Sequence, residues 1–132
     1  MTETPGTPEG DQPETPAGPM VALTNELAGS DGDIFSHAFK RMKLGPLVGK
    51  RTWGGLVGIG GYPGLMDGGS VTAPSFAIWS PEEGFTVENE GVPPDYDIDI
   101  FPKDVIAGRD PQLEKAVDLV MKELEKNPRK ID

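Results

Sequence analysis

The 132-residue sequence contains no cysteine, which excludes disulfide bonds, thiol nucleophiles and cysteine-ligated metals. It contains one histidine, His37, so there is only one candidate for a histidine base. No apolar run approaches the roughly 20 residues that a membrane-spanning helix needs. Met1 is followed by acidic and proline-rich sequence, not by the basic and apolar segments of a secretion signal. We therefore expect a soluble, cytoplasmic protein with no membrane partner.

Basic residues are scarce, with 12 Lys and Arg against 22 Asp and Glu. Because nucleic-acid affinity comes mainly from Lys and Arg neutralising phosphates, we expect no nucleic-acid partner. Residues 1–19 have no base and no aromatic residue, but five prolines and four acidic residues. Such a segment buries too little apolar area to offset its ordering entropy. The sequence therefore predicts a disordered tail over 1–19 and one folded domain over 20–132.

The hydrophobic pattern of the folded part predicts an α/β layer, in the order strand, helix, several strands and C-terminal helix. A strand over 20–26 precedes a helix over 31–43. Further short strands are predicted within 47–61, joined through Gly54 and Gly55, and within 70–80 and 84–92. The alternation over 95–101 predicts an edge strand with one wet face. Asp110 as N-cap and Pro111 as first residue predict the last helix, whose apolar stripe is Leu113, Ala116, Val117, Val120, Met121 and Leu124.

Ser30 lies where the first predicted strand turns into the first predicted helix, and two interpretations compete. Its oxygen could cap the helix, since Ser30 and Asp33 have nearly the spacing of a capping box. Alternatively Ser30 is a nucleophile at a helix N-terminus, where free amides favour an oxyanion. Spacing alone favours the cap. His37 lies roughly 10 Å along the helix at about 1.5 Å per residue, beyond hydrogen-bonding reach; we expect a packing residue, leaving Ser30 without a base.

The acidic run of Asp95, Asp97 and Asp99 raises the possibility of a calcium site. A calcium loop of the EF-hand type needs Gly at its sixth position and Glu at its twelfth. Counted from Asp95, those positions hold Ile100 and Ile106. We therefore interpret the run as the acidic face of a strand and expect no metal.

Three other features have structural interpretations. The glycine-rich residues 58–64 include Pro63 and lack the Lys-Ser/Thr of a phosphate loop, so a turn is predicted and no cofactor is expected. Trp79 is interpreted as a packing residue. A group of basic residues is interpreted as a solvated face: Lys40, Arg41, Lys43, Lys50 and Arg51.

Three motifs then occur in order: NELAGSDGD at 25–33, RTWGG at 51–55 and VENEGVPPD at 87–95. Together they resemble the catalytic core of tricorn-type proteases, within the wider tail-specific (carboxy-terminal processing) serine peptidase family. The resemblance extends over about residues 18–127 and implies part of a crotonase- or ClpP-like α/β layer. It implies that Ser30 is the nucleophile, that the N–H of Asp31 contributes to the oxyanion hole, and that Glu88 is the acid of the hydrogen-bonded relay.

In that family the histidine, a bridging serine and the second oxyanion donor lie upstream of the matching region. The resemblance therefore covers the second half of the catalytic core. A serine hydroxyl without a base is a weak nucleophile, and loss of a triad histidine removes several orders of magnitude of rate. We expect a serine-type peptidase domain that is inactive as an isolated chain.

Two alternatives remain open. The chain could be one half of a split protease, completed by a partner chain that supplies the histidine. It could instead be a non-catalytic binding or scaffolding module on the same fold. The expected partners are a peptide or unfolded polypeptide substrate and either a second copy of the chain or a complementing upstream half.

Overall fold

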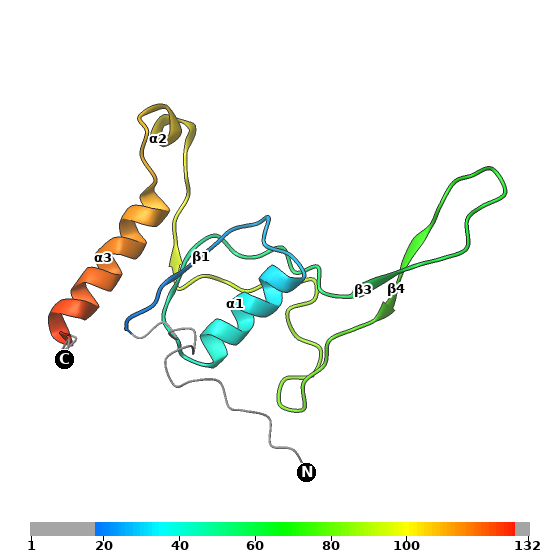
Figure 1. Cartoon of the computed structure of the whole chain (residues 1–132), viewed down its shortest axis with the longest axis horizontal. Helices are drawn as coiled ribbons and strands as arrows, with labels where there is room; N and C mark the ends of the chain where they lie inside the picture. Colours follow the sequence, from blue (N-terminus) through cyan, green and yellow to red (C-terminus); the bar gives the residue numbers. More distant parts are fainter. Residues whose placement is uncertain (1–17, 129–132) are drawn as a thin grey trace, which may run out of the picture.

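The computed structural model describes residues 18–128 (Figure 1), so almost all of the predicted tail lies outside the described residues. The α/β content predicted from the sequence is confirmed. The described elements are β1 Ala22–Thr24, α1 Asp31–Arg41, β2 Leu47–Gly49, β3 Gly58–Gly61, β4 Thr72–Phe76, β5 Tyr96–Asp97, α2 Pro102–Ile106 and α3 Pro111–Lys126.

The centre of the domain is a three-stranded parallel sheet in the order β1-β2-β5. Side chains alternate between the two faces of a strand, and successive residues of β1 contact α1 on one face and α3 on the other. Thr24 is buried with its hydroxyl 3.4 Å from that of Ser36 on α1. The neighbouring Leu23 instead lines an apolar groove with Leu113 and Val117 of α3. The sheet therefore lies between α1 and α3.

The hydrophobic core lies between the sheet, α1 and the loops that follow β2. Leu47 and Val48 of β2 are completely buried, because β2 is the middle strand. The cluster around Leu47 contains no residue of β3, β4 or α3. Its other buried members are Ala22, Phe39, Leu56, Val87 and Val92. Because Leu56 and Val87 belong to this core, it fixes the positions of the two loops that carry them.

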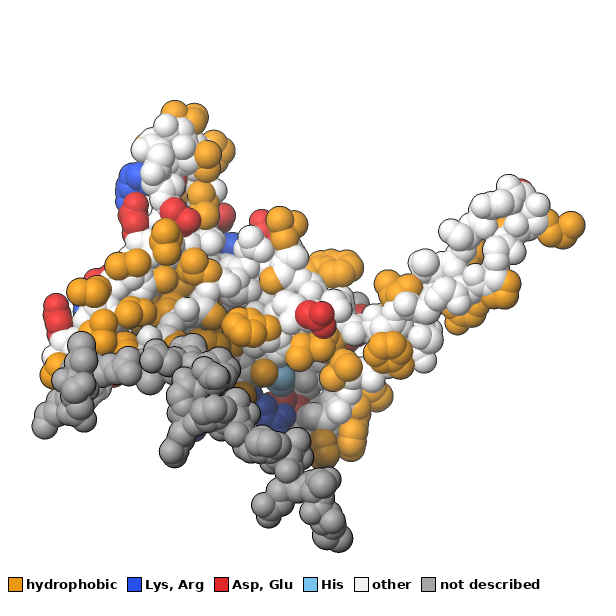
Figure 2. Space-filling view, in the orientation of Figure 1, with side chains coloured by type: hydrophobic (Ala, Val, Ile, Leu, Met, Phe, Trp, Pro, Cys, Tyr) orange, Lys and Arg blue, Asp and Glu red, His pale blue; other side chains and the backbone are white. Residues whose placement is uncertain are grey.

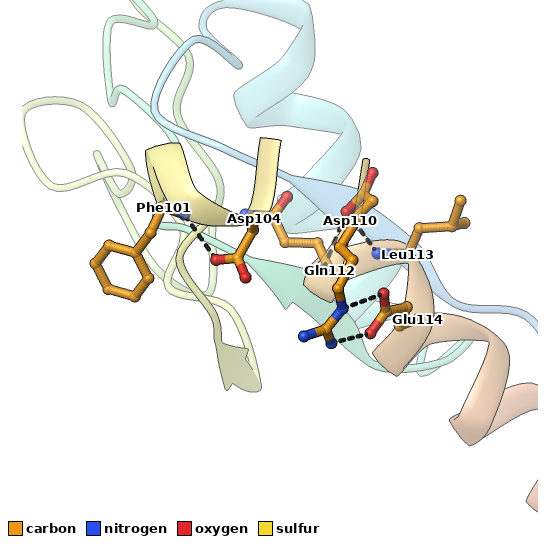
Figure 3. A network of polar contacts seen from close by, with 7 residues as sticks. Phe101, Asp104, Asp110, Gln112, Leu113 and Glu114 are labelled. Atoms are coloured by element: carbon orange, nitrogen blue, oxygen red, sulfur yellow. Dashed lines mark hydrogen bonds and ion pairs between the residues drawn. The ribbon is translucent and has the colours of Figure 1, made fainter. Parts of the chain in front are cut away.

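The predicted start of α3 is confirmed, with Asp110 as its N-cap (Figure 3). The Asp110 carboxylate accepts hydrogen bonds from the N–H groups of Gln112 at 3.1 Å and Leu113 at 3.0 Å. Gln112 in turn donates its side-chain amide to the carbonyl of Ile98 at 2.8 Å. This bond ties the first turn of α3 to the segment that follows β5. The predicted apolar stripe is only partly covered, since Val117 is 52% exposed.

Strands β3 and β4 form an antiparallel arm that extends away from the rest of the described structure (Figures 1 and 2).

Two expectations for the segment that follows β4 are wrong. Residues 84–92 form turns and not a strand, because Val87 and Asn89 have positive φ angles that extended pairing does not allow. Trp79 is 58% exposed and does not pack into the core.

The basic and acidic groups predicted to be separate solvated faces pair with each other. Lys40 on α1 lies 3.0 Å from the carboxylate of Asp95, and Lys50 contacts both Asp97 and Asp99. The strand predicted over 95–101 shortens to the two residues of β5 at the edge of the sheet. The acidic run therefore neutralises the lysines of α1 and of the loop after β2.

Asp95 also anchors the start of β2, because its carboxylate accepts the N–H of Leu47 at 2.8 Å. Burial opposes ionisation of Asp95, but the Leu47 N–H and the Lys40 ammonium outweigh this effect and hold its pKa below the usual value. Since the folded-state pKa lies below the unfolded one, ionised Asp95 stabilises the fold above about pH 4. That contribution is lost as the pH falls through the folded-state pKa.

We therefore expect Asp95→Asn to lower the free energy of unfolding by about 1 kcal/mol at pH 7. Its difference from the parent chain should shrink as the pH falls below about 4 and through the lowered folded-state pKa of Asp95. Urea denaturation at pH 7 and at pH 3 measures both values. Asp99→Asn, which removes a more exposed ion pair, serves as control; an equal loss in the two variants at pH 7 would contradict the anchoring role of Asp95.

Candidate active site

Ser30 occupies a sharp turn between β1 and α1. Its φ of 52° and ψ of −108° lie outside the regions that non-glycine residues ordinarily adopt. Strain of this kind persists only where the surrounding structure enforces it, and it is concentrated at functional sites. The turn lies between a strand and a helix, as does the turn that exposes the nucleophilic serine in α/β-hydrolases. The side chain of Ser30 is exposed to solvent.

The capping interpretation of Ser30 is wrong. Ser30 is the N-cap residue of α1, but its side chain makes no capping hydrogen bond. Its ψ angle of −108° is far from that of an extended N-cap. Asp33, the expected partner of the capping box, bonds elsewhere. The hydroxyl is thus left available for chemistry.

The peptide groups around Ser30 are held by their hydrogen bonds. Its N–H donates to the carbonyl of Gly55 at 3.0 Å, and its carbonyl accepts the N–H of Ile34 at 3.0 Å. Within residues 18–128, the N–H of Asp31 donates to no other group. This amide, at the positive end of the α1 dipole, is in the position expected of an oxyanion donor.

Glu88 contacts the loop that contains Gly55, the residue that accepts the Ser30 N–H. One of its carboxylate oxygens, Oε2, accepts two backbone N–H groups, from Leu56 at 2.6 Å and from Val57 at 2.8 Å. Because Gly55, which holds Ser30, directly precedes Leu56, a single short segment fixes both residues. The structure thus brings together Ser30 and Glu88, 58 positions apart in the chain.

The backbone around Glu88 is itself strained. Val87 and Asn89 have φ angles of 74° and 63°, which is costly for a β-branched residue such as valine. The N–H of Asn89 donates to the carbonyl of Gly54 at 2.7 Å, and the N–H of Gly91 to that of Val87 at 2.8 Å. These bonds hold the strained turn against the Gly54–Gly55 loop.

Asp33 is a buried residue of this frame that sequence reasoning did not identify. It is completely buried on α1, and its Oδ1 accepts the N–H of Gly54 at 2.9 Å. Its other oxygen has no hydrogen-bond partner within the described residues. The sequence offered a signal in the acidic residue three positions after Ser30, but that spacing is also typical of a cap.

His37 does not reach Ser30. It lies nearly two turns along α1, where its Nε2 is 2.9 Å from the carboxylate of Glu83. Arg41, one turn further on, contacts Glu82 at 2.9 Å. His37 thus belongs to a cluster of polar contacts that joins α1 to the turn after β4.

Two further features are absent from the described residues. Within residues 18–128, no three His, Asp or Glu side chains come close enough together to hold a metal ion. None of the described helices is long and apolar enough to cross a membrane. What the described residues do supply is an exposed serine, a free amide beside it and a fixed carboxylate.

Comparison with known proteins agrees with this geometry. Residues 2–98 match the sequence model of Peptidase family S41, which is well over half of the chain. The chain belongs to peptidase family S41. It is 52% identical over 107 residues to the Tricorn protease of Thermoplasma acidophilum, which covers 81% of the S41 chain.

Two further matches agree. A Putative Tricorn-like protease C-terminal subunit of Sulfurisphaera tokodaii is 52% identical over 108 residues, 82% of this chain. The crystal structure of the tricorn protease superposes with a TM-score of 0.74 over 80% of this chain, at 52% identity. The resemblance predicted from the three motifs is thereby confirmed.

The S41 chain spans only about a tenth of the length of these relatives, 10% of the Tricorn protease and 13% of the tricorn-like subunit. It likewise covers 10% of the solved tricorn chain. Membership therefore supports a serine peptidase at the level of the family.

Proposed function

We propose that this chain is the nucleophile-bearing half of a serine peptidase site that cleaves polypeptides. Ser30 is the nucleophile, the Asp31 N–H stabilises the oxyanion and Glu88 is the terminal acid of the relay. The observation that supports this most strongly is the strained, uncapped Ser30, hydrogen-bonded to the same Gly55–Val57 segment that binds Glu88. The domain that carries it is, in this proposal, part of a crotonase-like layer over residues 20–132.

The histidine base comes from outside these 132 residues. The chain has one histidine, and that residue is paired with Glu83. A serine without a base reacts slowly at neutral pH, so the chain alone has little peptidase activity. A complementing segment that carries the histidine completes the relay between Glu88 and Ser30.

A split assembly is favoured over a non-catalytic module by one specific observation. One carboxylate oxygen of Glu88, Oε2, accepts hydrogen bonds from two backbone amides. The residues on either side of Glu88, Val87 and Asn89, have strained positive φ angles in this arrangement. A scaffold with no chemistry gains nothing from that strain. That a relative is described as a C-terminal subunit supports the same arrangement, in a cytoplasmic complex of several chains.

The proposal is tested by mixing the chain with the preceding segment of the Thermoplasma acidophilum catalytic core and following a quenched fluorescent peptide. We expect no hydrolysis by either part alone and hydrolysis by the mixture. Ser30→Ala should abolish it, whereas Ser75→Ala, on the exposed arm, should leave it unchanged. Hydrolysis that survives Ser30→Ala, or a mixture that forms a stable complex without hydrolysing, would contradict the proposal.

A further inference from the structure

Trp53 is a large exposed aromatic residue held directly against the turn that presents Ser30. Its backbone N–H donates to the carbonyl of Ala28 at 2.9 Å, two residues before Ser30. The residue as a whole nevertheless remains 69% exposed. Single exposed apolar residues are common on proteins, so it is the position of Trp53 that needs explanation.

Two glycines provide the surface on which the ring lies. A Cβ at Gly29 would lie 2.6 Å from Cε3 of the indole, and a Cβ at Gly55 would lie 2.4 Å from its Cζ3. Neither distance is possible for a real side chain, so both positions must be glycine for the ring to lie where it does. Gly29 precedes Ser30, and the carbonyl of Gly55 accepts the Ser30 N–H.

The ring is therefore positioned by the backbone of the candidate site and not by the hydrophobic core. The buried residues of the core cluster do not include Trp53. An indole buries 150–250 Å² when it is covered, and here most of that area faces solvent. A rigid aromatic surface next to an exposed nucleophile is suited to contact an apolar side chain of a bound polypeptide.

We propose that Trp53 is a specificity-determining residue that binds a large apolar side chain of the substrate next to the scissile bond. This inference rests on the proposed function, because it takes the ligand to be the polypeptide that Ser30 attacks. Leucine and phenylalanine side chains fit the indole face, whereas a glutamate carboxylate is repelled by the negative charge of the ring face. Apolar contact with Trp53 contributes to substrate binding and not to activation of Ser30.

Tryptophan fluorescence tests this directly, because the chain contains only two tryptophans. In Trp79→Phe, emission reports Trp53 alone. Blocked hexapeptides with a central Leu or Phe should shift that emission to shorter wavelength in a saturable manner, and matched peptides with a central Gly or Glu should not. No shift with any of the peptides, or an equal shift with all of them, would overturn the proposal.

Binding of fluorescein-labelled Leu peptide, followed by anisotropy in the full chain, separates Trp53 from the second exposed tryptophan. Trp53→Ala should weaken binding at least tenfold and Trp53→Phe less than about threefold, while Trp79→Ala should have no effect. Ser30→Ala should bind normally, since the contact does not use the hydroxyl. Equal affinities of Trp53→Ala and Trp79→Ala would contradict the inference, even if Ser30 proves to be the nucleophile.

The two proposals can therefore fail independently. Peptide binding that depends on Trp53, together with a Ser30 that never acts as a nucleophile, would overturn the peptidase and support the polypeptide-binding surface. Because Trp53→Ala removes a ring that lies across two loops, the circular dichroism spectrum of each variant is compared with that of the parent chain. Trp53→Phe keeps an aromatic ring and gives the same test if Trp53→Ala does not fold.

Discussion

Gly54→Ala should lower the free energy of unfolding by about 3 kcal/mol. Gly54 has a φ of 81°, and a Cβ there would lie 2.5 Å from the backbone nitrogen of Gly91 and 3.0 Å from that of Glu90. Left-handed backbone costs roughly 1–2 kcal/mol for an L-residue, and overpacking against backbone that cannot move adds about 1–3 kcal/mol. The Glu88 turn must then separate from the loop that holds Ser30.

Gly61→Ala is the matched control for this experiment. Gly61 is the last residue of β3, where a Cβ would meet nothing within 4 Å, and its φ is not in the left-handed region. Its effect should remain within about 1 kcal/mol. Both variants are measured by urea denaturation with tryptophan fluorescence, and equal unfolding free energies would show that the Gly54 loop does not join the two halves of the site.

The second large effect is expected at Glu88, where charge and hydrogen bonding can be separated. Glu88→Gln keeps an oxygen that can accept the N–H groups of Leu56 and Val57 but removes the negative charge. In the complemented enzyme it should slow reaction at Ser30 by about 10³-fold, as expected when the acid of a catalytic triad is neutralised. Its unfolding free energy should change by less than about 1 kcal/mol, because the hydrogen bonds remain.

Glu88→Ala should lower both activity and stability, since it leaves two backbone N–H groups without an acceptor at a cost of about 2 kcal/mol. Glu90→Gln is the control, because Glu90 lies two residues away and is exposed. Its hydrogen bonds to Arg51 and Val87 use only its backbone carbonyl and N–H, which the substitution keeps. Rate constants come from peptide hydrolysis and stabilities from urea denaturation. Unchanged activity of Glu88→Gln would exclude a relay role for this carboxylate.

The sequence predicted the elements that local patterns determine. The apolar spacing of α1, the Asp110–Pro111 start of α3 and the β1-to-α1 order are all consequences of local chemistry. The predicted strand over 84–92 is wrong for a reason that pattern reading cannot detect. Val87 and Asn89 adopt positive φ angles because distant groups on the Gly54 loop hold them there.

The candidate site shows the same division. Motif order placed the chain in the correct family, and the roles of Ser30, Asp31 and Glu88 follow from that resemblance as predictions, whereas spacing alone favoured a helix cap for Ser30. The structure rules out the cap, because the Ser30 side chain makes no capping hydrogen bond. The Ser30 N–H instead donates to Gly55, 25 positions away in the chain. The role of Asp33 was likewise hidden, since its partner Gly54 lies 21 positions away.

The most direct test of the central proposal is the reaction of Ser30 with a fluorophosphonate, read by intact mass and peptide mapping. The proposed function predicts no adduct on the chain alone and a single adduct on Ser30 once the complementing segment is added. Ser30→Ala should remain unmodified in both conditions. An adduct on Ser30 in the isolated chain would mean that a base is already present, and an adduct elsewhere or none in the complex would mean that Ser30 is not the nucleophile.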